Sequence, residues 1–182
     1  MVFYKTMKNR IELAQRFAAL GFKKGAEIGV ASGYYSQVLL DNIPGLELLC
    51  VDSWGRRKSR NKCYPEALKI LSMYPGAKII KGFSMDAVKT VPDGSLDFVY
   101  IDADHTYESV KEDIREWAKK VRSGGIVSGH DYYKFKESGL GDVIKAVDEY
   151  VQEHTVDLQL TEWFHTNRNK DDRQPSWYFV KK

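Results

Sequence analysis

A short apolar run enters a glycine-rich turn in the stretch Ala26-Glu27-Ile28-Gly29-Val30-Ala31-Ser32-Gly33-Tyr34-Tyr35-Ser36. The run at 26–30 has the length and composition of a buried strand, and the glycines that follow it mark a turn. Beyond the turn, Tyr35, Val38 and Leu39 repeat at the i, i+3, i+4 spacing of a helix. This stretch therefore predicts a strand, a tight turn and a helix in direct succession.

Turn residues recur along the chain, and each set precedes a strand-like run. Pro75-Gly76 precedes residues 77–80, Pro92-Asp93-Gly94 precedes 96–101, Gly124-Gly125 precedes 126–128, and another strand is expected at 46–51. Helical patterns lie between these runs, at about 63–73, 84–90, 107–121 and 139–153. Strands that alternate with helices of this length predict right-handed crossovers, and hence an α/β doubly wound sandwich around a mostly parallel sheet.

The two ends of the chain depart from this alternation. Residues 5–20 have the apolar spacing of an amphipathic opening helix, and Gly21 is expected as its C-cap. Residues 156–160 and 177–180 are strand-like runs separated by a polar loop at 166–174, which predicts a terminal antiparallel hairpin. We therefore expect one domain over residues 1–182, with the opening helix within 1–21 and the hairpin within 154–182.

Composition and charge exclude several classes of protein. The chain has 182 residues, 43% of them hydrophobic, and its net charge of +3 is too small to indicate a polyanion-binding protein. No apolar stretch approaches the roughly 20 residues that cross a bilayer, and the N-terminus lacks the pattern of a signal peptide. We expect a cytoplasmic protein without a membrane span.

The carboxyl ends of the first two strands carry the residues of a candidate nucleoside site. Ligands of open α/β sheets bind at this edge, where Gly29 and Gly33 would let the backbone approach a ligand and Glu27 could accept hydrogen bonds. Asp52 ends the second strand, roughly 20 residues after the glycines, where an acid can accept hydrogen bonds from a ribose diol. A tight turn without any ligand is the alternative interpretation of the glycines alone.

The third strand is followed by Lys81-Gly82-Phe83-Ser84-Met85-Asp86. At the same edge of the sheet, Ser84 and Met85 could border an adenine ring. The alternative for Ser84 is a helix N-cap.

The densest set of functional groups follows the fourth and fifth strands. Ile101-Asp102-Ala103-Asp104-His105-Thr106-Tyr107 ends the fourth strand, and Ser128-Gly129-His130-Asp131-Tyr132 ends the fifth. Because these strands are neighbours in such a sheet, Asp102, His130 and Asp131 could converge on one divalent cation. The alternative is that Asp104 caps the next helix and Asp131 caps a turn.

These motifs resemble the class I S-adenosylmethionine-dependent methyltransferases. The resemblance covers about residues 24–132 and rests on Glu27-x-Gly29-x-x-x-Gly33, Asp52, Ser84 and Ile101-Asp102-Ala103-Asp104-His105. Asp52-Ser53-Trp54 and the run from Tyr100 to Asp113 look like the small enzymes grouped with the macrolide-sugar O-methyltransferases. The set is more distantly similar to the catechol O-methyltransferases.

The resemblance implies a fold and a role for each motif. It implies the strand order 3-2-1-4-5-7-6 with an antiparallel last strand, and S-adenosyl-L-methionine as cofactor. The site residues would be Glu27, Gly29 and Gly33 for the methionine part, Asp52 for the ribose, and Ser84 and Met85 for the adenine, with Asp102 also beside the cofactor. In metal-dependent relatives the positions of Asp102, His130 and Asp131 bind Mg²⁺, and that of His105 supplies the general base.

The residue at 130 departs from the pattern of the relatives, which place two oxygen ligands after the fifth strand. Imidazole suits Mn²⁺ or Zn²⁺ better than Mg²⁺, so the identity of the metal, Mg²⁺ or Mn²⁺, and the role of His130 stay open.

The predicted reaction is methylation of a hydroxyl on a small molecule such as a sugar, a phenol or a natural product. His105, with an ordinary pKa near roughly 6.5, could take the hydroxyl proton, while a cation on Asp102 and Asp131 stabilises the oxyanion. The residues after the fourth strand do not resemble the Asn-Pro-Pro-Tyr segment of amino-methylating enzymes.

Two other function classes are consistent with parts of the sequence. Tyr132 and Lys136 have the spacing of short-chain reductases that use NAD(P), although the glycine turn lacks GxGxxG. The segment Arg56-Arg57-Lys58-Ser59-Arg60-Asn61-Lys62 could serve a nucleotide- or RNA-binding module, cover the site as a lid for an acidic acceptor, or be a solvated loop. Nucleic acid is the less expected partner.

A homodimer is a further expectation, with a surface helix or the terminal hairpin as its interface, although packing in the core explains the same apolar positions.

Overall fold

The structure, a computed structural model, describes residues 7–55, 62–133, 142–163 and 174–182. The predicted basic segment, except for Lys62, therefore lies outside the described residues, as do Lys136 of the reductase spacing and most of the predicted polar loop at 166–174. No helix in these four ranges is long and apolar enough to cross a membrane.

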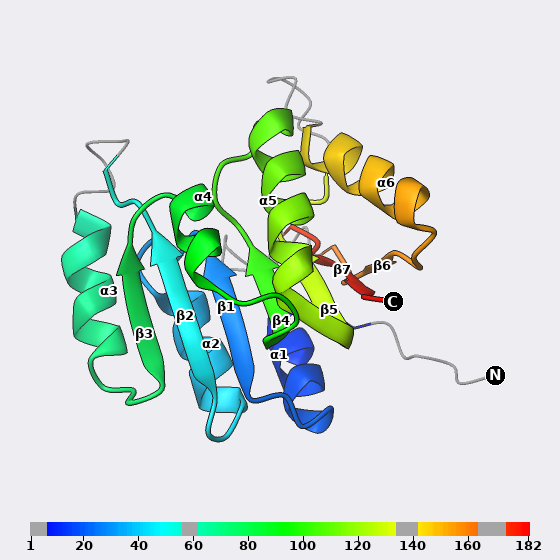
Figure 1. Cartoon of the computed structure of the whole chain (residues 1–182). Helices are drawn as coiled ribbons and strands as arrows, with labels where there is room; N and C mark the ends of the chain where they lie inside the picture. Colours follow the sequence, from blue (N-terminus) through cyan, green and yellow to red (C-terminus); the bar gives the residue numbers. More distant parts are fainter. Residues whose placement is uncertain (1–6, 56–61, 134–141, 164–173) are drawn as a thin grey trace.

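A seven-stranded sheet has the order β3-β2-β1-β4-β5-β7-β6, which confirms the predicted topology (Figure 1). Its strands are β1 (Lys24–Ile28), β2 (Glu47–Asp52), β3 (Ala77–Lys81), β4 (Leu96–Ile101), β5 (Val121–Gly129), β6 (Gln159–Leu160) and β7 (Trp177–Val180). Strands β1 to β5 pair in parallel, whereas β7 is antiparallel to both β5 and β6. The carboxyl ends of the five parallel strands consequently meet at one edge of the sheet.

Helices cover both faces of the sheet (Figure 1). One layer consists of α1 (Arg10–Ala19), α2 (Tyr34–Asn42) and α3 (Cys63–Leu71), and the other of α4 (Ser84–Ala87), the 3-10 helix η2 (Val88–Thr90), α5 (Tyr107–Lys120) and α6 (Asp142–His154). Each layer buries its own apolar cluster, centred on Phe17, Leu39 and Phe98 on one side and on Ile114, Trp117 and Val127 on the other. The period-2 alternation of the strands sends side chains to both clusters.

The opening helix begins later than predicted. Asn9 is its N-cap, and the Asn9 side chain accepts hydrogen bonds from the backbone N–H groups of Ile11 and Glu12 at 3.1 Å each. At the other end, Gly21 has φ +74°, and Phe22 N–H donates to the Phe17 carbonyl, as in a Schellman motif. The C-cap itself is Leu20, so Gly21 is the residue after the cap and not the predicted C-cap.

The prediction of a turn at Gly124-Gly125 was wrong. Strand β5 begins at Val121, directly after α5, and passes through both glycines. Pairing with β4 shifts register there, since Leu96 faces Val121 while Phe98 faces Ile126, and Gly124 takes φ +75°. The glycines therefore allow the strand to continue through this shift in register.

The last strands form the expected antiparallel hairpin, but β6 is shorter than the predicted 156–160 and holds only Gln159 and Leu160. The predicted helix at 84–90 is also divided, into α4 and η2.

Candidate functional site

The turn after β1 is crowded by the end of β4, and this crowding requires a glycine at position 29. Gly29 has φ +96°, and a Cβ atom on it would lie 2.0 Å from the carbonyl oxygen of Asp102. The two strands meet here through a hydrogen bond of 2.7 Å from Asp102 N–H to the Ile28 carbonyl. The close packing of the two backbones therefore requires glycine at position 29, whether or not a ligand also approaches it.

The carboxylate of Asp52 holds the glycine-rich turn in place. Its Oδ2 accepts from Ala31 N–H at 2.9 Å, and its Oδ1 accepts from Trp54 N–H at 2.7 Å. The indole Nε1–H of Trp54 in turn donates to the Ala31 carbonyl at 2.7 Å. We call Ala31, Asp52 and Trp54 the turn clamp. Ala31 and Trp54 have φ of 48° and 46°, a left-handed conformation that costs free energy in residues with a Cβ.

Glu27 lies beneath the turn and is 2% exposed. The hydroxyl of Ser36 on α2 donates to its carboxylate. Burial raises the pKa of Glu27 to about 8, against the opposing effect of the Ser36 hydrogen bond. The Glu27 side chain is therefore mostly neutral at pH 7.

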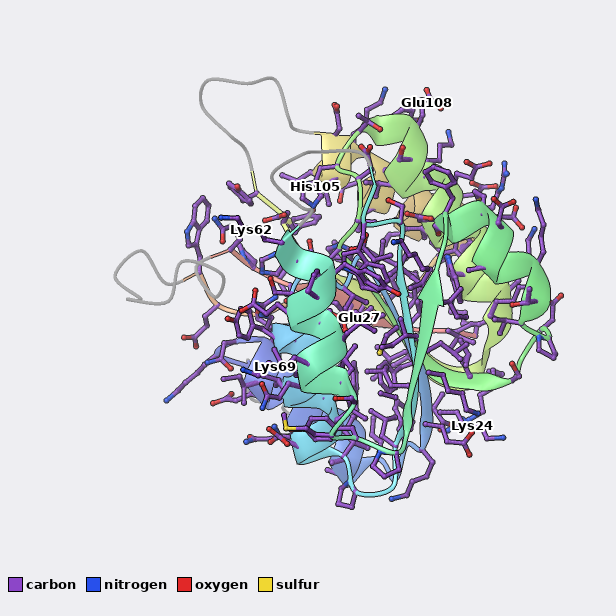
Figure 2. All side chains as sticks on the ribbon, turned by 90° about the vertical axis from the view of Figure 1, so that its left-hand side faces the viewer. Lys24, Glu27, Lys62, Lys69, His105 and Glu108 are labelled. Carbon is purple, nitrogen blue, oxygen red and sulfur yellow. The ribbon has the colours of Figure 1, made fainter. Side chains whose placement is uncertain are left out.

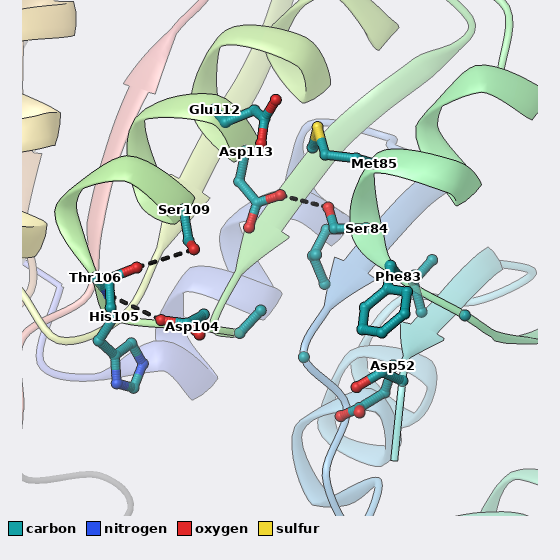
Figure 3. Close-up of a pocket in the computed structure, with 16 residues that line it drawn as sticks. Asp52, Phe83, Ser84, Met85, Asp104, His105, Thr106, Ser109, Glu112 and Asp113 are labelled. Carbon is teal, nitrogen blue, oxygen red and sulfur yellow. Dashed lines mark hydrogen bonds between the residues drawn. The ribbon is translucent and has the colours of Figure 1, made fainter. Parts of the chain in front are cut away.

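A cavity of about 480 Å³ opens at the carboxyl ends of the strands. Five of the predicted site residues line it, namely Gly29, Asp52, Ser84, Met85 and His105 (Figure 3). Glu27, Gly33, Asp102, His130 and Asp131 are absent from its lining among the described residues. Figure 2 shows His105 and Lys62 toward this end of the molecule, Lys24 toward the opposite end, and Glu27 between them.

Ser84 connects the two elements that border the cavity on the α5 side. It begins α4, whose N-cap is Phe83, so the alternative of Ser84 as an N-cap was wrong. Its hydroxyl donates to Asp113 Oδ1, and its Oγ accepts from Trp117 Nε1–H at 2.8 Å. The sequence reasoning missed Asp113, although an acid on the apolar face of a helix, between Val110 and Trp117, is a signal that could have identified it.

Two imidazoles and two carboxylates form a cluster beside the cavity. His105 Nε2 lies 3.3 Å from Asp102 Oδ1 and 3.1 Å from Asp131 Oδ2. His130 Nδ1 lies 3.8 Å from Asp102 Oδ2 and 3.3 Å from Asp131 Oδ1. Each imidazole therefore bridges both carboxylates, and the structure brings these four predicted residues together.

Arg10 approaches the same cluster from α1, and sequence reasoning gave no sign of it. Its guanidinium Nη1 is 3.8 Å from Asp102 Oδ2, and the group lies over the Tyr35 ring at 4.9 Å from the centroid. A residue near the N-terminus thus places a positive charge beside the end of β4.

The cluster changes the proton affinity of its members. The hydrogen bond to Asp102 raises the pKa of His105, and the charges of Asp131 and Asp102 add to this effect against the desolvation of the ring. Burial opposes ionisation of Asp131, but the His130 hydrogen bond and the charges of His130, His105 and Arg10 hold its pKa below the usual value. Asp104 instead accepts from Thr106 N–H at 3.0 Å, while Thr106 is the N-cap of α5.

The donors of the cluster fit a divalent cation. Asp102, His105 and Asp131 each offer a ligand atom, and these atoms lie within 4.8 Å of one another. The set predicted from the sequence has His130 in place of His105. Among the described residues, His130 Nε2 is a buried polar atom without a hydrogen-bond partner. Carboxylates combined with imidazole suit Mn²⁺ or Zn²⁺ better than Mg²⁺.

The described part of the reductase spacing does not support that alternative. The Tyr132 hydroxyl donates to Asp148 on α6 at 2.6 Å. Burial, and to a smaller extent this hydrogen bond, raises the pKa of Tyr132. Tyr132 is also absent from the lining of the cavity, which is given for the described residues.

Solved structures with the same fold include methyltransferases that act on different atoms. The O-methyltransferase from Bacillus cereus in complex with S-adenosylhomocysteine has a TM-score of 0.71 at 14% identity, covering 94% of this chain and 80% of that one. TomG from Streptomyces achromogenes, an O-methyltransferase of tomaymycin synthesis in complex with S-adenosylmethionine, has a TM-score of 0.69 at 17% identity, covering 95% and 80%. Precorrin-6y C5,15-methyltransferase from Geobacter metallireducens has a TM-score of 0.65 at 14% identity, covering 94% and 88%.

Sequence comparison assigns the family. A search of curated proteins finds no match, whereas the model of a family described as a methyltransferase domain matches residues 26–132, more than half of the chain. That span runs from the first strand of the sheet to the end of the acid and imidazole cluster. The chain therefore belongs to the methyltransferase-domain family, within the class I S-adenosylmethionine-dependent methyltransferases.

Proposed function

We propose that this methyltransferase transfers a methyl group to a hydroxyl of a small molecule. The observation that carries the proposal is the position of His105, which lines the cavity and contacts the carboxylates of both Asp102 and Asp131. A hydroxyl is a poor nucleophile until its proton is removed, and a histidine held by carboxylates is a common general base. Sugars, phenols and natural products carry suitable hydroxyls.

The proposed cofactor site follows the cavity from the glycine turn to α4. Gly29 and Gly33 would border the methionine part, Glu27 would support the turn from below, and Asp102 would lie beside it. The lone pairs of the Asp52 carboxylate that Ala31 and Trp54 leave free can accept from the ribose hydroxyls. Ser84 and Met85 would border the adenine. When bound, S-adenosylmethionine supplies a methyl group on a sulfonium, and the acceptor oxygen takes this methyl group in line with the carbon–sulfur bond that breaks.

His105 acts as the general base in this proposal, and the other imidazole has a different role. The side chain of His105 is 36% exposed and lines the cavity, whereas His130 is 7% exposed. An acceptor hydroxyl in the cavity can therefore reach His105 but not His130. Asp102 and Asp131 hold the His105 ring in position and stabilise its protonated form.

A divalent cation, Mn²⁺ in preference to Mg²⁺, would be held by Asp102, Asp131 and the His130 that the sequence predicts, although the ligand atoms that lie within 4.8 Å of one another are those of Asp102, His105 and Asp131. Such a cation supplies positive charge that stabilises the deprotonated acceptor. The contact of His105 with the same carboxylates would then orient the base next to that charge.

The test measures S-adenosylhomocysteine formed from S-adenosylmethionine with a panel of phenols and sugar alcohols, with and without Mn²⁺. Removing a general base typically costs 10²- to 10⁴-fold, so we expect His105→Asn to lower turnover by about that factor while S-adenosylhomocysteine still binds. His154→Asn, on the exposed end of α6, is the matched control and should keep turnover within about twofold.

Turnover by His105→Asn at the wild-type rate would contradict the assignment of the base. If EDTA changes neither turnover nor thermal stability, the proposal of a cation is wrong. A cytoplasmic location and a homodimer stay predictions from the sequence.

A further inference from the structure

Asp113 is a buried acid that the proposed reaction does not use. It is 5% exposed, on the same face of α5 as Val110, Ile114 and Trp117. It nevertheless lines the cavity, beside Ser84 and Met85. A carboxylate in such an apolar setting is costly unless donors compensate it.

One oxygen of the carboxylate is fixed by a hydrogen-bond chain with a defined direction. The indole N–H of Trp117 can only donate, so Ser84 Oγ accepts from it at 2.8 Å. The proton of the Ser84 hydroxyl then points to Asp113 Oδ1. This chain orients the carboxylate between α4 and α5, and Figure 3 shows the second oxygen turned away from Ser84.

The second oxygen, Oδ2, has no donor within the described part of the chain. It also differs from His130 Nε2 in not being sealed from solvent, because only that atom is both enclosed and unpaired among the described residues. A ligand in the cavity can therefore supply the missing donor.

The position of Asp113 in the cavity matches the base of a nucleoside. Asp52, the proposed ribose partner, and Asp113 lie in different parts of the same cavity, with Phe83 and Ser84 between them (Figure 3). Phe83 is 53% exposed and lines the cavity between them. At the far end from the ribose, adenine presents its 6-amino group, a donor, whereas a 6-oxo purine presents an acceptor.

We propose that Asp113 determines the specificity for the purine, because its Oδ2 accepts a hydrogen bond from the 6-amino group of adenine and repels a 6-oxo group. This inference deepens the proposed function and rests on its placement of the adenine at Ser84 and Met85. Trp117 and Ser84 are positioning residues, since they orient the carboxylate.

The experiment measures dissociation constants by isothermal titration calorimetry at pH 8 for three ligands. These are S-adenosylhomocysteine, S-inosylhomocysteine and the analogue with an unsubstituted purine. Burial raises the pKa of Asp113 only to about 6, so its carboxyl is ionised at this pH. From the strength of hydrogen bonds to charged groups, we expect wild type to prefer the 6-amino ligand by about 10- to 100-fold over both others.

Asp113→Asn is the decisive variant because it exchanges an acceptor for a donor without changing shape. The Asn oxygen can still accept from Ser84, which leaves its NH₂ group facing the purine. We expect the preference to fall at least tenfold or to reverse toward S-inosylhomocysteine. Glu108→Gln removes a carboxylate from an exposed position of the same helix and should keep the wild-type preference.

Each remaining outcome contradicts a specific statement. Equal weakening of all three ligands by Asp113→Asn would give Asp113 a structural role only and overturn the inference. Equal affinity of wild type for the three ligands would overturn it even if the variant does not fold. If wild type binds none of them, the proposed function fails together with the inference.

Discussion

The carboxyl of Glu27, buried in the middle of the sheet, stays protonated in the folded chain up to a higher pH than in the unfolded chain. The contribution of Glu27 to stability therefore depends on pH. The pKa is raised from 4.5 to about 8, mainly by burial. Between these two values the folded chain binds the proton and the unfolded chain releases it. The free energy of unfolding therefore decreases as pH rises through this window, by at most about 1.4 kcal/mol per pH unit.

We predict that Glu27→Gln removes this slope. The carboxamide oxygen can still accept from Ser36, and a neutral group has no charge to desolvate as the pH rises. Urea unfolding at pH 5.5, 7 and 8.5 should show the variant gaining stability relative to wild type at each step. Glu108→Gln should follow the wild-type profile. Parallel profiles for Glu27→Gln and wild type would show that Glu27 is already ionised in the folded state.

The turn clamp fixes the loop that follows β1 against the end of β2. Asp52 sits at the end of β2, and both of its oxygens accept from backbone N–H groups, while the Trp54 indole secures the Ala31 carbonyl. The left-handed residues Ala31 and Trp54 persist because these bonds compensate for their strain.

We predict that Trp54→Phe lowers stability by about 1–3 kcal/mol, the cost of a part-buried carbonyl that loses its donor. Because the turn would be less well fixed, affinity for S-adenosylhomocysteine should also fall, by up to about tenfold. Denaturant unfolding and calorimetry measure the two effects. Trp163→Phe, at an exposed position where the ring contacts Tyr133, should leave the affinity unchanged. A Trp54→Phe variant with reduced stability but wild-type affinity would separate the clamp from ligand binding.

The elements of this fold are largely readable in the sequence, and their fine structure is not. Changes of hydrophobic period and recurrent Gly and Pro residues locate the strands, and parallel strands bring their ends together, which is why Asp102, His105, His130 and Asp131 could be grouped. The start of β5 could not be predicted, because glycines inside an irregular strand look like a turn. Arg10 was missed because only tertiary packing brings α1 to the end of β4.

The sheet combines two groups of residues with different tasks. The ends of β1, β2 and β3 carry Gly29, Asp52 and Ser84, which line the proposed nucleoside cavity. The ends of β4 and β5 carry the cluster of carboxylates and imidazoles. If the groups are independent, a change in the second should leave nucleoside binding intact.

We predict that S-adenosylhomocysteine at about 100 times its dissociation constant stabilises wild type by about 2.7 kcal/mol. For a chain of this length, the melting temperature should rise by several degrees. Asp131→Asn, which alters the cluster without touching the lining of the cavity, should show the same rise, while a rise induced by Mn²⁺ should be lost. Loss of the S-adenosylhomocysteine effect in Asp131→Asn would mean that the two groups act as one site.

The close approach of Gly29 to the Asp102 carbonyl joins the residues at the ends of β1, β2 and β3 to the cluster at the ends of β4 and β5. The contact requires glycine at position 29, but Asp102 takes part in it only through its backbone carbonyl, so the contact does not depend on the side chains that follow β4 and β5. Substitutions of the side chains after β4 and β5 can therefore leave this contact, and with it the glycine turn of the proposed cofactor site, in place.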